Sequence, residues 1–377
     1  MKKKGLRLIV GITLAAVLAV GIPLFTSCTA PSTTPEPTPT PEPTPDEPTP
    51  TPEEPGEEQT VYNLKMITVF PGGESAEESA GQFARDVEAA SNGRVQIEWF
   101  VPGEIVPEAE SVLAVKTGTV DLCQWPFCMG GPLDGGSDFC LIEGGIPFGW
   151  LNPFECMTIF DWRGMFELAQ DAHHEFGTHL IAIELDDPQV PIATEPITGA
   201  DWFEGKKISA LPTMAPIYEE LGASPITLAF EEFYLSLQTG VVDAVHWSGP
   251  LDQWALGTYE VAPYMVATSF VNPVIEDIFA NKDTWDSLPP DIQEIITLAA
   301  RETSLRHHTR VYVRTMEVVE NWEVNYYSDE DFARIQDIAM AQWDDMAATS
   351  PRAAAAIDIL RSFREEVNTT GWKGALK

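Results

Sequence analysis

Basic residues are scarce in this chain of 377 residues. It carries 22 Lys and Arg against 58 Asp and Glu, a formal net charge of −36. Proteins that bind nucleic acid neutralise phosphates with Lys and Arg, so this balance excludes nucleic acid as a partner. The shortage is most severe between Ser209 and Asn281, where the sequence has no Lys or Arg at all.

Sequence motifs of enzymes are also missing. The stretch HHEFGTH separates His174 from His179 by five positions, whereas the H-E-x-x-H zinc motif needs four to place both imidazoles on one helical face. There is no G-x-S-x-G, no phosphate loop and no C-x-x-C pair. We therefore expect that the protein is not an enzyme and requires no cofactor.

Cysteines are few, and their spacing fits no zinc site. Beyond Cys28, only Cys123, Cys128, Cys140 and Cys156 occur. In an exported protein they could form one or two disulfides, although the sequence does not reveal the pairing. Buried free thiols are the alternative.

The only long apolar run lies at the N-terminus. Four basic residues precede an apolar stretch over 8–25, and Thr-Ser-Cys follows it. This pattern predicts a lipoprotein signal peptide over 1–27 with Cys28 acylated, so that the mature protein is extracytoplasmic and lipid-anchored to a membrane. A membrane-spanning helix is the alternative, which the short run disfavours.

The segment 28–59 is predicted to be a stalk. Residues 29–59 contain eleven prolines, eight acidic residues and no basic ones. Such a composition cannot form a packed core, and repeated X-Pro holds the chain extended.

From residue 60 the sequence alternates between strand-like and helix-like segments, which predicts an α/β fold with mostly parallel sheets. We expect one lobe over 60–185, completed by about 273–290, a second lobe over 186–272, and C-terminal helices over 291–377. The first of these helices begins near Pro290 and is unusually long. It could bridge the lobes or pair with a second copy of the chain.

One phrase occurs twice, 122 residues apart. LAVKTGTVDLCQW begins at Leu113 and LSLQTGVVDAVHW begins at Leu235, and they share L-x-x-x-T-G-x-V-D-x-x-x-W. Each copy is predicted to be a helix end, a tight Thr-Gly exit and a short strand, followed by a tryptophan. Because ligands bind beyond the carboxyl ends of parallel strands, we expect Trp125 and Trp247 to face one another across a cleft. A chance match of common helix-to-strand sequence is the alternative.

The chain resembles a family of transport receptors. SNGRVQIEWFVPGEIVP, EFYLSLQTGVVDAVHWSGP and NKDTWDSLPPDIQEIITLAA are similar to sequences of the DctP-type extracytoplasmic solute receptors of tripartite ATP-independent periplasmic (TRAP) transporters, especially the subset that binds 2-oxo and hydroxy acids. The resemblance covers about 60–365. It implies a two-lobed, periplasmic-binding-protein-like fold with mixed sheets and a hinge, which closes on a small ligand and delivers it to a membrane permease.

Two positions depart from the family pattern. Where the family usually has a carboxylate-binding arginine after G-x-K-I, this chain has Ser209. Where the oxo-acid subset has a glutamate that helps to hold a cation, it has His246. A serine cannot replace the paired charge-assisted bonds of a guanidinium. The ligand charge is then met by other groups or a bound Na⁺ or Ca²⁺, or the ligand is not a simple carboxylate.

The candidate site therefore combines aromatic walls with polar groups. A tryptophan face buries apolar ligand surface while its N–H donates, and a histidine is expected to titrate near neutrality. Each could instead be a core residue. Acidic side chains after the strand HLIAIEL could hold a metal ion, or could merely be solvated. The predicted ligand-binding residues are Trp125, Trp247, His246, Ser209, Glu184 and, near the rim, Gln253; Asp186 and Asp187 are further metal candidates.

Two functions remain open. The first is a transport receptor for a small organic acid, with or without a cation. The second is a sensory or scavenging lipoprotein on the same scaffold, which binds a neutral or cationic molecule.

Overall fold

The computed structural model describes residues 60–70, 72–126 and 145–370. The predicted signal peptide, Cys28, the stalk, Cys128 and Cys140 lie outside these residues. Residues 57–377 form one compact unit. Within the described ranges, no helix combines the length and the apolar character needed to cross a membrane.

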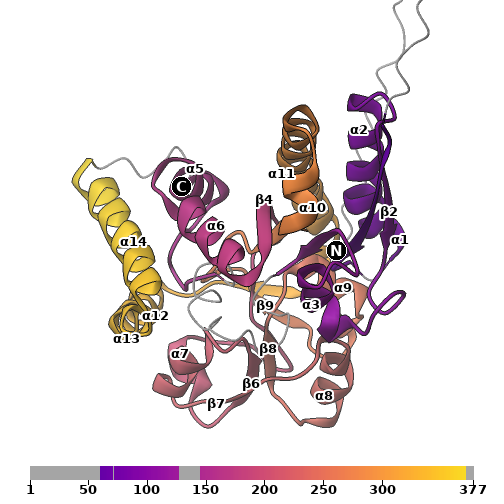
Figure 1. The fold of residues 1–377 in the computed structure, drawn as a ribbon. Coiled ribbons are helices and arrows are strands. Elements are labelled where there is room, and N and C mark those ends of the chain that lie inside the picture. Colours follow the sequence, from indigo (N-terminus) through magenta and orange to yellow (C-terminus); the bar gives the residue numbers. More distant parts are fainter. Residues whose placement is uncertain (1–59, 71, 127–144, 371–377) are drawn as a thin grey trace, which may run out of the picture. The chain divides into compact units, whose positions relative to one another are not determined.

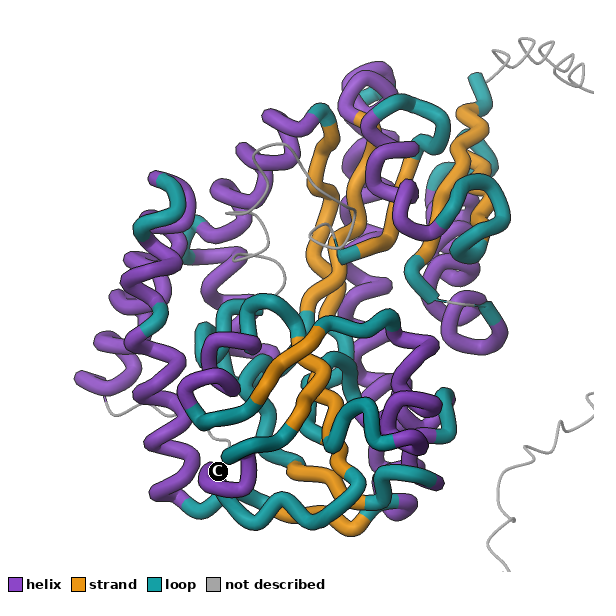
Figure 2. The backbone as a smooth tube through the Cα atoms, turned by 90° about the horizontal axis from the view of Figure 1, so that it is seen from below, coloured by secondary structure: helices purple, strands orange, loops and turns teal. Residues whose placement is uncertain are grey.

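The first lobe is built on a five-stranded mixed sheet in the order β2-β1-β3-β10-β4. Strands β1 and β2 pair in parallel, as do β1 and β3, while β10 runs antiparallel to β3 and β4. Figure 2 shows the strands running between layers of helices. The strands are β1 (Tyr62–Thr68), β2 (Val95–Phe100), β3 (Leu122–Trp125), β4 (Thr178–Leu185) and β10 (Ile275–Asn281).

Helices cover both faces of this sheet, because successive apolar side chains of each strand point to opposite faces. Met66 and Ile278 pack with α2 in one core, while Ile67 and Phe279 pack with α3 in another. The helical elements of this lobe are α1 (Gly73–Ala76), the π-helical turn η1 (Glu77–Gly81), α2 (Gln82–Ala90), η2 (Glu108–Glu110), α3 (Ser111–Lys116), α5 (Pro153–Trp162), α6 (Met165–Phe176) and α10 (Lys282–Ser287).

The second lobe is built on a six-stranded sheet in the order β11-β9-β5-β8-β6-β7. Its strands are β5 (Ile192–Ala193), β6 (Lys207–Ala210), β7 (Ser224–Ile226), β8 (Ala244–His246), β9 (Tyr264–Val266) and β11 (Glu323–Asn325). Its helical elements, grouped near β6–β8 in Figure 1, are η4 (Ala200–Phe203), α7 (Ala215–Glu220), η5 (Phe230–Glu232), α8 (Phe233–Thr239), α9 (Pro250–Ala255) and η6 (Thr258–Glu260). The expectation of helices alone over 291–377 missed β11, a strand of three residues.

The repeated phrase ends a helix in the same way in both lobes. Gly118 and Gly240 have φ of +71° and +72°, a left-handed conformation that glycine adopts without strain. Thr117 donates its hydroxyl to the carbonyl of Leu113 four residues earlier, and Thr239 does so to the equivalent leucine. The helix exits predicted from Thr-Gly are confirmed.

The shared aspartate also has the same task in both copies. Asp121 accepts the backbone N–H of Lys65 in β1, and Asp243 accepts that of Lys207 in β6, each at 2.8 Å. Each carboxylate therefore ties the start of a strand to its parallel neighbour. The repeat encodes one supersecondary unit used twice.

The long helix α11 (Pro290–Val318) bridges the two lobes. It packs against β4 and α2 of the first lobe and against α9 of the second. The bridging prediction is thus confirmed, while pairing with a second copy stays a prediction. The chain continues through η7 (Val319–Asn321), α12 (Asp329–Ala341), α13 (Trp343–Ala347) and α14 (Pro351–Thr370).

The largest core joins both lobes to the C-terminal helices. Phe160 of α5, Tyr218 of α7 and Trp343 of α13 are all members of it. Trp343 donates its indole N–H to the carbonyl of Pro147 at 3.2 Å, and Trp150 donates to that of Pro273 at 2.8 Å. These two buried indoles thus keep their N–H groups paired.

Candidate functional site

Chain topology marks one crevice in each sheet. The chain runs from β1 to β2 and then returns to place β3 on the other side of β1; it runs from β6 to β7 and then places β8 on the other side of β6. At such reversals the loops diverge, which opens a ligand crevice beyond the carboxyl ends of the central strands. The crevices therefore lie after β1 and β3 in one lobe and after β6 and β8 in the other.

Two chain segments cross between the sheets, and we call residues 186–191 and 267–274 the hinge region. They are held together by backbone hydrogen bonds, from Asp186 N to Val274 O at 2.9 Å and from Gln189 N to Val271 O at 3.3 Å. Because both segments pass from one sheet to the other, they are where the lobes can rotate about one another.

Asp187 fastens the hinge region to the second lobe. Its carboxylate accepts the backbone N–H of Leu251 in the first turn of α9 at 3.1 Å and the hydroxyl of Thr315 on α11 at 2.9 Å. Its side chain lies so close to Gly249 that a Cβ added there would be 2.3 Å away. Burial, followed by the nearby Asp186, raises the pKa of Asp187 well above its usual value.

Glu184 sits in a buried hydrogen-bond network of the first lobe. Ser79, in the π-helical turn η1, donates to one carboxylate oxygen at 2.9 Å, and Gln124 of β3 donates to the other. Thr68 in turn donates to the Gln124 carbonyl at 2.7 Å. Burial raises the pKa of Glu184, and its neighbour His307 and these hydrogen bonds oppose that effect.

His307 of α11 is the cation of this region. Its Nε2 lies 3.1 Å from Asp186 Oδ1 and its Nδ1 lies 3.7 Å from Glu184 Oε1, while its ring packs on Phe70 with centroids 4.9 Å apart. Burial alone would lower the pKa of His307, but Glu184 and Asp186 raise it to about 9. The imidazole is therefore protonated at neutral pH.

The predicted metal candidates have protein partners instead. Glu184, Asp186 and Asp187 each accept hydrogen bonds or an ion pair from the groups described above. Across residues 60–126 and 145–370, no group of three or more His, Cys, Asp or Glu is arranged to hold a metal ion. Both oxygens of Glu184 and one oxygen each of Asp186 and Asp187 thus contact the protein itself.

One buried carboxyl group differs from these three. Glu276 of β10 pairs directly with Glu184 of β4 and is 6 % exposed. Its Oε2 has no hydrogen-bond partner, and no donor among the described residues reaches this side chain. Burial, followed by Asp186, Glu184, Asp277 and Asp252, raises the pKa of Glu276 well above its usual value.

The two tryptophans of the repeat lie in different cores. Trp125 is 2 % exposed and packs with Cys123 and Phe279 on the α3 face, where its Nε1 lacks a partner among the described residues. Trp247 is half-buried and packs against Phe233 of α8, with ring centroids 5.9 Å apart. The two indoles share no core, and each stands at the predicted edge of its sheet.

Ser209 and His246 point to opposite faces of the second sheet. Ser209 pairs in register with Val245, so it shares the α8 face with Trp247; His246 pairs with Ala210 and so faces α7. The Ser209 hydroxyl is fully buried without a hydrogen-bond partner among the described residues. These two candidates therefore cannot contact a ligand from the same side of the sheet.

His246 is a core residue. It is fully buried, and its Nδ1 lies 2.5 Å from the Tyr218 hydroxyl. Burial lowers its pKa to about 4, with the nearby Gln189 carbonyl opposing this effect. The expectation that His246 titrates near neutrality is therefore wrong, because the protein excludes the water that would stabilise its charge.

Gln253 is not at a rim. It is fully buried in α9, where its amide N–H donates to Ser248 Oγ at 2.9 Å and its carbonyl oxygen has no partner among the described residues.

Of the cysteines, Cys123 and Cys156 are buried free thiols, and burial raises the pKa of each well above its usual value.

The residues that the sequence did not single out come from elements far apart in the chain. His307, Gln124 and Ser79 meet Glu184 from α11, β3 and η1, and Glu276 meets it from β10. No short motif links these positions. The π-helical turn, a feature often found at functional sites, is visible only in the structure.

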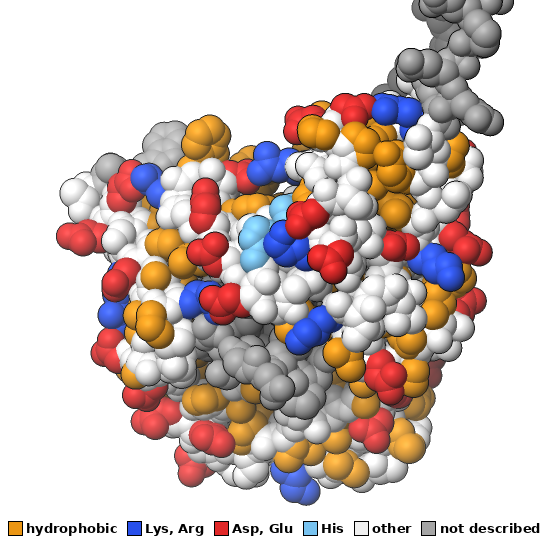
Figure 3. Space-filling view, viewed as in Figure 1, with side chains coloured by type: hydrophobic (Ala, Val, Ile, Leu, Met, Phe, Trp, Pro, Cys, Tyr) orange, Lys and Arg blue, Asp and Glu red, His pale blue; other side chains and the backbone are white. Residues whose placement is uncertain are grey.

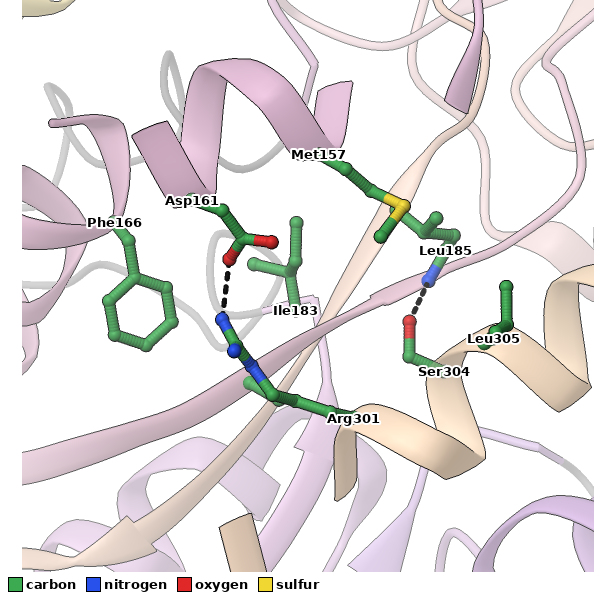
Figure 4. Close-up of a pocket in the computed structure, with 9 residues that line it drawn as sticks. Met157, Asp161, Phe166, Ile183, Leu185, Arg301, Ser304 and Leu305 are labelled. Atoms are coloured by element: carbon green, nitrogen blue, oxygen red, sulfur yellow. Dashed lines mark hydrogen bonds and ion pairs between the residues drawn. The ribbon is translucent and has the colours of Figure 1, made fainter. Parts of the chain in front are cut away.

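A separate cavity of about 260 Å³ lies between α5, α6 and α11, beside the edge strand β4. Figure 4 shows Arg301 paired with Asp161 at 2.5 Å and Ser304 accepting the backbone N–H of Leu185 at 3.1 Å. The cavity contains none of the predicted ligand-binding residues.

Figure 3 shows acidic side chains spread over the face that it draws, interspersed with fewer basic ones.

Curated relatives of the chain bind different solutes. It is 25% identical over 252 residues to a monocarboxylate 2-oxoacid-binding periplasmic protein of Nostoc sp., which covers 64% of this chain and 66% of that protein. It is 28% identical over 193 residues to the ectoine-binding periplasmic protein TeaA of Halomonas elongata, covering 48% of this chain and 54% of that one. The match thus spans less than two thirds of the length of these relatives.

Solved structures share the fold at low identity. A TRAP periplasmic solute binding protein of Colwellia psychrerythraea, with bound calcium and pyruvate, gives a TM-score of 0.74 at 18% identity over 83% of this chain and 97% of that one. One from Chromohalobacter salexigens, with bound (S)-(+)-2-amino-1-propanol, gives 0.72 at 22% identity over 82% and 98%. These likenesses show the two-lobed α/β fold.

A family model decides the classification. The model described as bacterial extracellular solute-binding protein, family 7 (DctP), matches residues 67–349, well over half of the chain. The match includes both sheets, the hinge region and α11. The chain therefore belongs to the DctP family of bacterial extracellular solute-binding proteins.

Proposed function

We propose that the protein is an extracytoplasmic solute receptor that captures a small organic acid between its lobes and delivers it to a TRAP-type permease. The observation that carries the proposal is that each lobe has one reversal in strand order and therefore one crevice. The two lobes are connected by two hinge segments and bridged by α11. A ligand bound by both crevices contacts both lobes only when they are closed, so it shifts the population toward the closed form.

The organic-acid class is supported by the relatives. The Nostoc protein is a 2-oxoacid-binding protein, another relative from Rhodobacter capsulatus is a C4-dicarboxylate-binding one, and the Colwellia structure holds pyruvate with calcium. The ligand of this chain would then be a 2-oxo or hydroxy acid, with Na⁺ or Ca²⁺ as a companion. Acylation of Cys28 and the stalk would hold the receptor at the membrane beside its permease.

A second candidate is a binding or sensory protein for a neutral or cationic solute. It is favoured by the absence of Lys and Arg over 209–281 and by the acidic surroundings of Glu276. The ectoine-binding relative and the structure with bound 2-amino-1-propanol show that the fold accepts such solutes.

Calorimetric titration of the protein with pyruvate, lactate and malonate, with and without Ca²⁺ or Na⁺, tests the organic-acid proposal. Small-angle scattering at saturation should show a smaller radius of gyration than in the free protein. An unchanged radius with a saturating ligand would exclude closure.

Trp247→Ala tests where the ligand lies. Because Trp247 is half-buried beside the crevice after β8, the variant should bind the ligand over tenfold more weakly while staying folded. Trp162→Ala is the matched control, since that indole is 81% exposed on α5. Equal affinities of the two variants would remove Trp247 from the site.

A further inference from the structure

We propose that the solute carries a protonated amino group and that Glu276 is the carboxylate that receives it. The inference rests on the second candidate function given above, a receptor for a cationic solute, and names the charged group that it recognises. It applies to an amine, an amino alcohol or an amino acid alike, because the ammonium group is the feature that is recognised.

The position of Glu276 follows from strand register. Directly opposed residues of an antiparallel pair project to the same face, so Glu276 stands beside Glu184 on the face that also holds Ser79 and His307. The pair lies next to the last one of the ladder, Ile275 with Leu185, at the edge where the ligand crevice opens. Glu276 is therefore a carboxyl group of the crevice edge and not of the distant core.

The side chains beside Glu276 use the nearby hydrogen-bond donors for themselves, and none of those described donates to Glu276. Glu184 takes the donors of Ser79 and Gln124, and His307 lies between Glu184 and Asp186. The Oε2 atom of this 94% buried side chain costs free energy, because it is shielded from water and has no hydrogen-bond partner among the described residues. A ligand that donates hydrogen bonds removes this cost.

The second lobe adds negative charge on the other side. Asp252 of α9 is close enough to interact electrostatically with both Glu276 and His307, and no described residue donates a hydrogen bond to its side chain. The same helix holds the unpaired carbonyl oxygen of Gln253. Two arginines of α11 pair with other acids, Arg306 with Asp86 and Arg310 with Glu78. Among the described residues, no ion pair joins a Lys or Arg to Glu276.

An ammonium group suits this environment better than a metal ion. Ca²⁺ requires six to eight oxygen ligands, whereas both oxygens of Glu184 and one oxygen each of Asp186 and Asp187 already have protein partners. An ammonium group has three N–H donors, so Glu276 and one or two further acceptors satisfy it. The bond between the ammonium and the carboxylate is charge-assisted and stronger than a neutral hydrogen bond.

Binding is coupled to the release of a proton. The groups that face Glu276 are Glu184 of β4, Asp186 of the hinge region, Asp277 of its own strand, Asp252 of α9 and, beyond Glu184, His307 of α11. Burial, followed by these four carboxylates, raises the pKa of Glu276 well above its usual value, which favours the protonated carboxyl in the free receptor. When R–NH₃⁺ binds, the carboxyl O–H bond breaks, the proton leaves to solvent and the carboxylate pairs with the ammonium. Affinity therefore rises with pH until the free carboxyl ionises.

The test is calorimetric titration of the full chain with compounds that share a carbon skeleton and differ in one group. The first series is alanine, lactate and pyruvate; the second is 2-amino-1-propanol and 1,2-propanediol; longer skeletons follow in the same form. We expect the amine member of a series to bind at least tenfold more tightly than its hydroxyl or oxo counterpart. Titrations in buffers of different ionisation enthalpy should show one proton released per amine bound.

Variants separate recognition from a structural role. Glu276→Gln should weaken amine binding at least tenfold and abolish proton release, whereas Asp121→Asn, an acid at the far edge of the same sheet, should change neither. Should Glu276→Gln fail to fold, Asp252→Asn in the other lobe is expected to weaken amine binding in the same direction. Circular dichroism establishes which variants are folded.

Three outcomes would overturn the inference. If the hydroxy or oxo acid binds as tightly as the amine, the ligand class is wrong while the receptor function stands. If Glu276→Gln binds amines with unchanged affinity and proton release, another group receives the ammonium. If no member of any series binds, the proposed receptor function fails and this inference fails with it.

Discussion

The charge of His307 should stabilise the folded protein in a way that depends on pH. In the folded state its pKa is about 9, against a usual value of 6.5 for an unfolded histidine. A difference of this size corresponds to about 3 kcal/mol, at 1.36 kcal/mol for each pKa unit. Because the folded pKa is the higher one, this stability is fully present below about pH 6.5 and is lost as the pH rises through 9.

The perturbation is His307→Gln, which keeps a polar side chain on α11 but removes the titratable charge. At pH 6 the variant should lose the ion pairs with Asp186 and Glu184, leaving buried carboxylates uncompensated, so the destabilisation should be about 3 kcal/mol. At pH 10 the wild-type imidazole is neutral, and the difference should shrink to under about 1 kcal/mol.

Urea unfolding followed by circular dichroism, at pH 6 and pH 10, measures the two free energies of unfolding. His174→Gln is the control, because that histidine lies exposed at the end of α6 away from the acidic groups. If His307→Gln costs the same free energy at both pH values, the imidazole is not charged in the folded protein, and the electrostatic account of the hinge region is wrong.

Two further predictions concern the hinge region and the repeat. Gly249→Ala would put a Cβ 2.3 Å from the side chain of Asp187, over 1 Å closer than normal carbon contacts of about 3.5 Å. The variant should therefore be destabilised by about 2–3 kcal/mol, as measured by thermal denaturation. A melting temperature equal to that of the wild type would show that Gly249 and Asp187 are not in such close contact. Asp243→Ala removes one 2.8 Å bond to a backbone N–H and should cost about 1 kcal/mol in urea unfolding, whereas Asp121→Ala also removes the 3.2 Å bond from the Thr284 hydroxyl and should cost more; a smaller cost for Asp121→Ala would contradict this account.

Much of the fold could be predicted from local sequence signals. Gly118 and Gly240 mark the ends of α3 and α8 because glycine adopts positive φ without strain, and the alternation of strands and helices indicated parallel sheets. β11 escaped prediction because three residues carry too little periodicity, and its pairing with β9 depends on a residue range some 60 positions earlier.

The candidate site was less predictable, because burial and register decide which side chains meet. Ser209 and His246 both occupy positions that the family pattern highlights, yet the register turns them to opposite faces of one sheet. No motif marks Glu276 in the sequence. Its importance comes from its pairing with Glu184 of β4, a neighbouring strand that lies much earlier in the chain. Such contacts depend on tertiary structure, which a linear pattern does not contain.

The repeated scaffold and the polar chemistry occupy different parts of the molecule. The shared aspartates and glycines build equivalent crevices, whereas the carboxyl groups around Glu276 come from β4, β10 and α9, which lie outside the repeat. Glu276 belongs to the first lobe and Asp252 to the second, so without a cation the closed form either keeps a proton on Glu276 or brings two like charges together. An ammonium between them pairs with the ionised carboxylates in the closed form alone. Solute charge would then control closure directly, and a solute without the ammonium would leave Glu276 protonated and without that bond.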